Sequence, residues 1–263
     1  MKVIITGSTK GIGRAMAKEF LRCGDGVIIS SRSAERVAAV AEELKKEFPG
    51  GAVWGAACDV SRPADVEALA RFGKEKFGTL DIWINNAGTD GHQKRPLAEC
   101  TPEMLKLVID TNLLGTVLCC RAALAVMLQQ RCGHIFNVDG YGASGIPTPK
   151  LAAYGATKRA ILQLMATLVK ETQGTGVGIH TISPGMVLTD LLIEGATPET
   201  AKVLNILTEL PEPVAQFLVS RVRAVKGTGT YIQYLTKANV LWRFITAWKR
   251  KSRFFDEQGR LIA

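Results

Sequence analysis

Residues 6–13 read Thr-Gly-Ser-Thr-Lys-Gly-Ile-Gly. They follow a short β-branched run and open a helical pattern over residues 14–23. Glycines at positions 7, 11 and 13 allow positive φ and let the backbone approach an anion at the positive end of that helix. A glycine-rich turn between a strand and a helix is typical of dinucleotide sites. The sequence therefore predicts a phosphate loop made of Gly7, Ser8, Thr9, Lys10, Gly11, Ile12 and Gly13.

The rest of the chain repeats this order of strand and helix. Candidate strands lie at residues 3–6, 27–30, 52–57, 81–85, 134–138, 178–182 and 231–235. Strict alternation implies a parallel sheet that is covered by helices on both faces. Because there is no internal repeat or linker, the sequence predicts a single α/β domain over residues 1–263, a doubly wound Rossmann fold with seven parallel strands.

Two segments in the C-terminal third depart from this alternation. The connection before the seventh strand is too long for a plain crossover, so residues 188–226 are expected to form a helical substrate flap. Residues 238–255 carry Trp242 and Trp248 together with a basic cluster. This amphipathic segment is expected either to lie on an anionic membrane surface or to pack as a terminal helix or subunit interface.

The composition is that of a folded chain with a surplus of positive charge. Of 263 residues, 47% are hydrophobic and 22% are charged, which excludes a disordered or collagen-like polymer. The most apolar stretch, residues 113–128, is interrupted by Arg121, so no membrane-spanning segment is expected. The first strand is expected from Val3, so no signal or transit peptide is expected ahead of it in this sequence. Either the protein works where it is made, or a targeting segment lies outside this sequence. A net charge of +9 is compatible with nucleic acid, an anionic membrane or an anionic small molecule.

The cysteines and histidines predict no metal site. The three histidines, at positions 92, 134 and 180, are too far apart in sequence to suggest a local zinc site. The cysteines lack paired C-x-x-C spacing and are expected to be reduced structural thiols in a reducing compartment. These cysteines are Cys23, Cys58, Cys100, Cys119, Cys120 and Cys132.

The end of the second strand favours NADPH over NADH. An NAD site usually has a carboxylate there for the ribose 2′-hydroxyl, whereas this chain has Ser31, Arg32 and Ser33. Arg32 and Lys10 are expected to flank a 2′-phosphate, because a guanidinium binds phosphate oxygens in a forked geometry. The alternative is that both cations are merely solvated.

Two further strand ends complete the expected cofactor site. Asp59 and Val60 follow the third strand and are expected beside an adenine ring. Asn86, Ala87 and Gly88 follow the fourth strand, where small residues and amides can bracket the ribose. These positions agree with one another, because ligands of doubly wound sheets bind at the carboxyl ends of the strands.

Tyr154 and Lys158 are the expected reducing pair. Residues four apart project from the same face of the helix predicted over residues 151–172. A free phenol titrates near pH 10, too high for efficient acid–base work at neutral pH, and a nearby ammonium favours the phenolate. Tyr154 is therefore expected to protonate a carbonyl oxygen as hydride arrives, with Lys158 tuning its pKa.

Taken together, these motifs resemble the short-chain dehydrogenase/reductase family over essentially the whole chain. The resemblance implies a single Rossmann domain, a nicotinamide cofactor and reversible hydride transfer to a carbonyl. It also implies that Asn112 holds a water in a proton relay to Lys158. By the same resemblance, the residues that line the nicotinamide are Pro184, Gly185, Val187 and Thr189.

One feature departs from that family. Most members end the fifth strand in a serine pair, with the catalytic serine thirteen residues before the tyrosine, and that position is Tyr141 in this chain. Ser144 is the nearest hydroxyl expected to bond the substrate carbonyl. The alternatives are Tyr141, Asp139 or a backbone amide.

The same region narrows the resemblance to a subfamily. The strings Ile-Phe-Asn-Val-Asp-Gly at 135–140, Ala-Ala-Tyr-Gly-Ala-Thr-Lys-Arg at 152–159 and Ser-Pro-Gly-Met-Val at 183–187 look like chlorophyll b reductases of the non-yellow-coloring type. That resemblance implies NADPH-dependent reduction of the 7-formyl group of chlorophyll b or chlorophyllide b to a hydroxymethyl group, the first step of chlorophyll b breakdown.

The partners and the location follow from this resemblance as expectations. The resemblance implies contact with a thylakoid surface or a light-harvesting complex. It also implies assembly, either as a homo-oligomer (dimer or tetramer) or as a hetero-oligomer with a related reductase. They imply the chloroplast stroma or thylakoid surface in a plant or alga, and the cytoplasm otherwise. No nucleic acid is expected, because Lys10, Arg32 and Lys158 have places at a dinucleotide. Two alternatives stay open: a reductase of another bulky carbonyl, or a weakly active binding subunit of a reductase complex.

Overall fold

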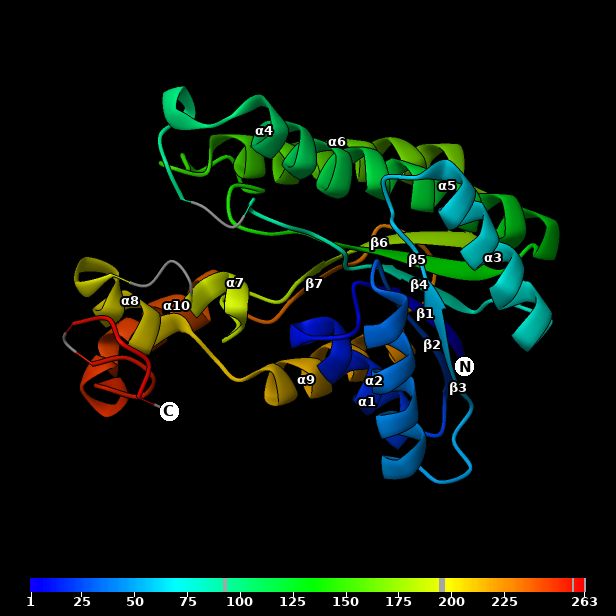
Figure 1. Ribbon diagram of the computed structural model, residues 1–263, viewed down its shortest axis with the longest axis horizontal. Coiled ribbons are helices and arrows are strands. Elements are labelled where there is room, and N and C mark those ends of the chain that lie inside the picture. The colour runs from blue at the N-terminus through cyan, green and yellow to red at the C-terminus, as the bar shows by residue number, and fades with distance from the viewer. Residues whose placement is uncertain (92–93, 194–196, 257, 263) are drawn as a thin grey trace.

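A computed structural model describes residues 1–91, 94–193, 197–256 and 258–262, so His92 lies outside the described part. Seven parallel strands form one sheet in the order β3-β2-β1-β4-β5-β6-β7 (Figure 1). The predicted seven-stranded parallel sheet is therefore confirmed. The strands are β1 Lys2–Thr6, β2 Gly26–Ser31, β3 Val53–Ala57, β4 Ile82–Asn85, β5 Gly133–Val138, β6 Val177–Ser183 and β7 Tyr231–Gln233.

Helices cover both faces of the sheet (Figure 1). One layer holds α1 (Gly11–Arg22), α2 (Ala34–Glu47) and α9 (Pro211–Ala224), and the other holds α3 (Pro63–Phe77), α4 (Pro102–Ile109), α5 (Gly115–Gln130) and α6 (Ala152–Glu171). Alternate residues of each strand enter opposite cores, because side chains of a strand point to opposite faces. On β1, Val3 and Ile5 pack with the first layer and Ile4 packs with the second.

The stretch Pro102–Gln130 is long and apolar enough to cross a membrane, by length and composition alone. In this fold it is a helix of the second layer, and 44% of its most apolar window is buried. Its α5 part places Cys119, Ala123 and Met127 in the core against the sheet. A core helix passes the same composition test, so the stretch carries no separate argument for a membrane.

The expected flap is shorter than the sequence suggested. From residue 188, α7 (Asp190–Ile193) and α8 (Pro198–Leu207) lie beyond the carboxyl edge of the sheet, next to the C-terminal segment (Figure 1). By contrast α9, which falls inside the predicted 188–226, packs beneath the sheet in the core that also contains α1. Its apolar face, Val214, Leu218 and Val222, is buried there, so only residues up to 210 form a flap.

The C-terminal segment is mostly exposed and rests on the flap. It contains α10 (Lys237–Ile245) and a 3₁₀ turn, η3 (Ala247–Arg250). No residue of α10 is buried, whereas Phe254 and Phe255 join Leu204 of α8 in a small third core. The flap and the C-terminal segment therefore form one lobe with a core of its own.

Three of the cysteines belong to the core. Cys58, Cys119 and Cys120 are buried, and burial raises the pKa of each thiol, to about 12 for Cys58 and Cys120. Cys23 and Cys132 are exposed, so they are not core thiols. Within the described ranges, no group of three or more His, Cys, Asp or Glu residues lies close enough to hold a metal ion.

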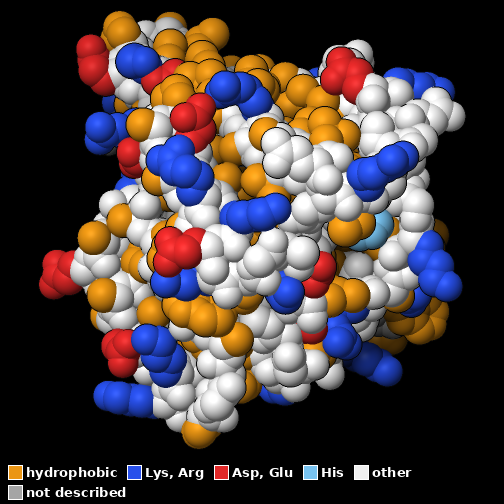
Figure 2. All heavy atoms as spheres, turned by 90° about the vertical axis from the view of Figure 1, so that its right-hand side faces the viewer, with side chains coloured by type: hydrophobic (Ala, Val, Ile, Leu, Met, Phe, Trp, Pro, Cys, Tyr) orange, Lys and Arg blue, Asp and Glu red, His pale blue; other side chains and the backbone are white. Residues whose placement is uncertain are grey.

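The face seen in Figure 2, on the side of the sheet away from the lobe, carries scattered charge. Lysines and arginines alternate with acidic side chains and hydrophobic ones on this face, without one continuous basic stripe.

Candidate active site

The glycine loop is locked to the end of the fourth strand. Thr6 Oγ1 accepts the N–H groups of Asn86 and Ala87, both at 3.1 Å, and Asn86 Nδ2 donates to the carbonyls of Thr6 and Gly7, both at 2.9 Å. Gly7 has φ +62°, and a Cβ there would lie 2.8 Å from Ala87 Cα. A side chain at position 7 is therefore excluded by both space and backbone conformation, which explains the glycine.

The start of α1 is suited to an anion. The helix begins at Gly11, three residues before the predicted start, and Lys10 at its N-cap makes no side-chain cap. The first turn contains no acidic residue. Ser8 turns away from this helix end: its Oγ donates to Ile5 O at 2.6 Å and accepts Ser30 N at 2.9 Å. The N–H groups at the start of α1 therefore fit a pyrophosphate.

The end of β2 fits the ribose of a dinucleotide. Of the two cations predicted there, Arg32 is exposed, whereas Lys10 is paired with a carboxylate. Ser31 Oγ is buried and has no hydrogen-bond partner among the described residues, so a ligand atom would satisfy it. Arg32 is exposed beside it. Ser33 caps α2 by accepting Arg36 N at 3.2 Å. Lys10 Nζ instead pairs with Asp190 Oδ2 of α7 at 2.8 Å, so Arg32 is the better placed of the two predicted cations.

Asp59 and Val60 lie at the carboxyl end of β3, as expected for the adenine side. Asp59 Oδ1 accepts the N–H and hydroxyl of Ser61 at 3.0 and 2.7 Å, which fixes the carboxylate at this edge. Val60 is buried, and a Cβ at Gly115 would lie 2.7 Å from its Cγ2. Close approach of α5 to this loop therefore requires the glycine at the start of that helix.

The predicted nicotinamide segment lies next to the glycine loop. The Thr189 Cγ2 atom is 3.1 Å from the position of a Cβ on Gly11, so the start of the flap touches the phosphate loop. Val187 forms a parallel β-bridge with Glu209. Gly185 has φ +73°, and a Cβ there would lie 2.7 Å from Leu235 Cβ. The structure thus brings the loop and the segment after β6 together, with Pro184 between β6 and Gly185.

Lys158 is a buried lysine with one clear anchor. Its Nζ donates to Val138 O, the last residue of β5, at 3.0 Å, and lies 5.7 Å from the centre of the Tyr154 ring. Burial lowers the pKa of Lys158 to about 8, and the charge of Asp139 opposes that shift. The ammonium is therefore poised to lose its proton just above neutral pH.

The Tyr154 phenol differs from the sequence-based expectation. Its pKa is raised, by burial first and then by the charges of Asp139 and Asp90. The sequence led us to expect that Lys158 lowers this pKa, whereas burial and the two carboxylates raise it in this arrangement. A neutral phenol at physiological pH is nonetheless the form that can donate a proton to a carbonyl oxygen.

Asn112 lies in a single turn of π-helix, Asp110–Leu114, that joins α4 to α5. Such turns are frequent at functional sites. Its Oδ1 accepts Thr89 N at 2.8 Å, and its Nδ2 donates to Thr89 O at 2.8 Å and to Thr157 Oγ1 at 3.2 Å. Asn112 Oδ1 and Lys158 Nζ both flank Gly88, at 3.5 and 3.7 Å from the position of a Cβ there. Asn112 is therefore fixed close to Lys158, as a relay requires.

The first glycine after β5, Gly140, leaves no room for a side chain. A Cβ at Gly140 would overlap Tyr154 Oη and lie 3.2 Å from Lys158 Cε. Ser144 is exposed on the following loop, and its hydroxyl has no hydrogen-bond partner in the described part of the chain. Tyr141 is exposed as well and donates to Pro147 O at 3.2 Å. Of the side chains proposed for the serine's role, only Asp139 is buried.

Sequence reasoning missed Tyr231. This first residue of β7 donates its hydroxyl to Asp139 Oδ2 at 2.5 Å, across a sequence separation of 92 residues. No local pattern could have found it, because parallel pairing of β6 with β7 is what brings Tyr231 to this edge.

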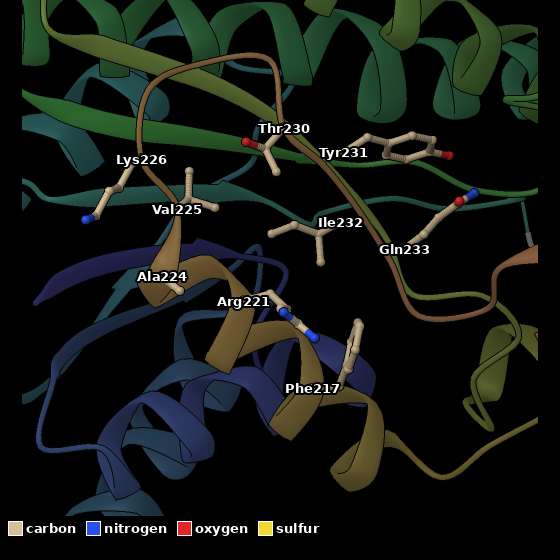
Figure 3. A pocket seen from close by; sticks show the side chains of 9 residues that line it. All are labelled: Phe217, Arg221, Ala224, Val225, Lys226, Thr230, Tyr231, Ile232 and Gln233. Atoms are coloured by element: carbon tan, nitrogen blue, oxygen red, sulfur yellow. The ribbon is translucent and has the colours of Figure 1, made fainter.

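A separate cavity of about 430 Å³ opens between β7 and α9 (Figure 3). Ile232 points from the strand towards α9, while the Tyr231 ring points away from that helix. The cavity is lined by Phe217, Arg221, Ala224, Val225, Lys226, Thr230, Tyr231, Ile232 and Gln233. It contains neither Tyr154 nor the glycine loop, and among its lining residues only Tyr231 also contacts the site, through Asp139.

This fold and this set of residues define an oxidoreductase that uses a nicotinamide cofactor. The sequence model of the family described as short chain dehydrogenase matches residues 1–199. The chain belongs to that family.

Two curated relatives are similar over nearly all of the chain. It is 46% identical over 276 residues to "Probable chlorophyll(ide) b reductase NYC1, chloroplastic" of Arabidopsis thaliana, a match covering 99% of this chain and 55% of that protein. It is 47% identical over 268 residues to "Chlorophyll(ide) b reductase NOL, chloroplastic" of the same plant, covering 97% and 77%. The chain thus spans about half the length of the first relative and about three quarters of the second.

A solved structure shares the fold. The 3-ketoacyl-(acyl-carrier-protein) reductase of Brucella melitensis complexed with NADH superposes with a TM-score of 0.77 at 29% sequence identity. The match covers 88% of this chain and 95% of that one.

Proposed function

We propose that this chain reduces the 7-formyl group of chlorophyll b or chlorophyllide b to a hydroxymethyl group with NADPH. The observation that carries the proposal is the identity of 46–47% to chlorophyll(ide) b reductases over at least 97% of the chain. The site supports the same chemistry, because Tyr154 and Lys158 lie together at the carboxyl end of β5, where Lys158 also borders Gly88.

The chain's own groups supply the proton and hold the reacting carbonyl. A reduced nicotinamide, when bound, would supply the hydride for the formyl carbon. Tyr154 gives its phenolic proton to the carbonyl oxygen, so that C=O becomes CH–OH. Lys158 supports the phenolate that forms, and Asn112 anchors the water through which a proton returns from solvent. Ser144 stays a candidate for bonding the carbonyl, since the loop that carries it is exposed.

NADPH is proposed rather than NADH because of the cations at the end of β2. The start of α1, which has no acidic residue, is proposed to hold the pyrophosphate. Asp59 and Val60 are proposed to lie beside the adenine, and Asn86, Ala87 and Gly88 beside the adjoining ribose. Arg32 and the buried, unpartnered Ser31 Oγ lie where a 2′-phosphate would enter.

The location and the partners are proposed from the same relatives, both of which are named chloroplastic. A contact with the thylakoid surface or a light-harvesting complex stays a prediction, and α10 with its exposed Trp242 is the segment proposed to make it. Assembly as a dimer or tetramer, or with a related reductase, also stays a prediction.

The decisive assay uses purified protein, NADPH and chlorophyll b or chlorophyllide b, with pigments separated by chromatography. We expect a 7-hydroxymethyl product. Tyr154→Phe removes the proton donor and is expected to lower kcat at least a hundredfold, in line with the usual contribution of a general acid, while NADPH still binds.

Tyr234→Phe serves as a matched control, because it also removes a phenolic hydroxyl but lies outside the site; it should leave product formation unchanged. No product from the unaltered chain, under conditions where NADPH binding is measured, would contradict the proposal. That outcome would favour another bulky carbonyl substrate or a binding subunit.

A further inference from the structure

Asp139 is a buried carboxylate that accepts a long-range hydrogen bond from Tyr231. It follows β5 directly and is 5% exposed. Tyr231 Oη donates to its Oδ2 at 2.5 Å. Tyr231 belongs to the edge strand β7 and is 47% exposed, so this hydrogen bond joins a solvent-facing phenol to a buried charge.

Asp139 is placed between the two residues that touch the Tyr154–Lys158 pair. Its predecessor, Val138, accepts the Lys158 ammonium at 3.0 Å. Its successor, Gly140, packs so closely on Tyr154 Oη that no side chain fits there. Any movement of Asp139 is therefore transmitted through the backbone to both members of the pair.

The charges around the pair come from four elements. In the described part of the chain, the titratable groups that act on it are Tyr154 and Lys158 on α6, Asp139 after β5, Asp90 after β4 and Tyr231 on β7. Burial raises the pKa of Asp139, while hydrogen bonds from Tyr231 and Ser183 and the charge of Lys158 oppose the shift. The hydrogen bonds thus favour the carboxylate form, whose charge supports the buried ammonium.

We propose that Asp139, held by Tyr231, is a positioning residue that keeps the Lys158 ammonium charged and in place. The inference rests on the proposed reaction, in which Lys158 supports the phenolate. It gives the end of β5 a role other than that of the absent serine: the carboxylate acts on the lysine and not on the substrate carbonyl.

The test follows Lys158 itself and needs no pigment. In protein carrying ¹³C at lysine Cε, the resonance that Lys158→Arg removes identifies Lys158, and its chemical shift is followed against pH. Asp139→Asn keeps the size of the side chain but removes its charge. We expect the midpoint of the Lys158 titration to fall by about one pH unit, the usual size of a nearby opposite charge.

Tyr231→Phe is expected to lower the same midpoint by less, because the released carboxylate turns towards water. In the Asp139→Asn background, Tyr231→Phe should add nothing, since Tyr231 acts through the carboxylate. Tyr234→Phe is the matched control and should leave the titration unchanged. With a reducible substrate, the alkaline limb of kcat should move by the same amount as the titration, with KM unaltered.

An unchanged Lys158 midpoint in Asp139→Asn overturns the inference, as does an additive effect of the two substitutions. If Asp139→Asn fails to fold, Tyr231→Phe carries the test, and an unchanged midpoint there is decisive. The Lys158 titration is measured without substrate. A chain that fails to reduce chlorophyll b therefore contradicts the proposed function but does not decide the role of Asp139.

Discussion

At the scale of single residues, the two cations predicted to bind a 2′-phosphate have different surroundings in the structure. Lys10 and Arg32 were expected to act as a pair, yet Lys10 is joined to Asp190 of the flap. That contact spans 180 residues of sequence, which no local pattern reports. Arg32 therefore carries most of the expected preference for a 2′-phosphate.

Arg32→Leu is predicted to raise the KM for NADPH about tenfold or more and to leave the KM for NADH nearly unchanged. A charge-assisted hydrogen bond to phosphate contributes roughly 1.5–3 kcal/mol, which sets that magnitude. Initial rates with each cofactor measure the effect. Arg22→Leu, which removes an exposed arginine at the other end of α1, is the matched control. Equal losses with both cofactors would contradict the assignment.

At the scale of elements, one acidic residue joins the two parts of the lobe, the flap and the C-terminal segment. Glu209, between α8 and α9, accepts Arg243, Arg250 and Arg253 at 3.3, 2.9 and 2.8 Å. Burial raises the pKa of Glu209, but the three arginines outweigh it and hold that pKa below its ordinary value. The sequence left open whether the segment with the basic cluster lies on a membrane surface or packs against the protein. In the structure, Arg250 and Arg253 of that cluster hold the C-terminal segment against the flap.

Glu209→Gln is predicted to destabilise this lobe, because it leaves three guanidinium groups close together without a counter-charge. Removing one partner of a largely buried ion cluster costs on the order of 3 kcal/mol. Limited proteolysis should cut the C-terminal segment faster, and the melting temperature should fall. Glu43→Gln, which breaks the exposed pair with Arg14, is expected to cost at most about 1 kcal/mol. Equal effects of the two substitutions would refute the clamp.

At the scale of the whole molecule, the sheet contains a pair of histidines, buried His180 and half-buried His134, that links stability to pH. His134 Nδ1 and His180 Nε2 are 2.9 Å apart across β5 and β6, although the two residues are 46 apart in sequence. Burial first, and then His134, lowers the pKa of His180 to about 4. An unfolded histidine titrates near pH 6.5, so between these values the unfolded chain binds more protons.

The stability that this pair contributes is therefore complete above about pH 6.5 and is lost as the pH falls towards 4. From pH 7 to pH 5 we expect the free energy of unfolding to fall by about 2 kcal/mol on account of His180. Urea denaturation at the two pH values measures the change. His180→Gln should remove most of that pH dependence, and a variant with the same slope as the unaltered chain would disprove the linkage.

The sequence by itself determined the order of the elements, the parallel sheet and the position of the glycine loop. Those features depend on local periodicity and on turn chemistry, which neighbouring residues carry: Gly7 and Gly13 follow a strand, and Tyr154 and Lys158 share one helical turn. The same local rules placed Asp59 at that edge, whereas Asn112 and Val187 were named only by the resemblance to the family.

Only the tertiary structure decided what those residues touch. It buried α9 under the sheet instead of in a flap, paired Lys10 with Asp190, and brought Tyr231 to Asp139. Burial and charge from other strands, and not the helical spacing, set the pKa values of Tyr154 and Lys158. Such contacts depend on strand pairing and packing between distant segments, and local sequence does not encode the distances on which electrostatic interactions depend.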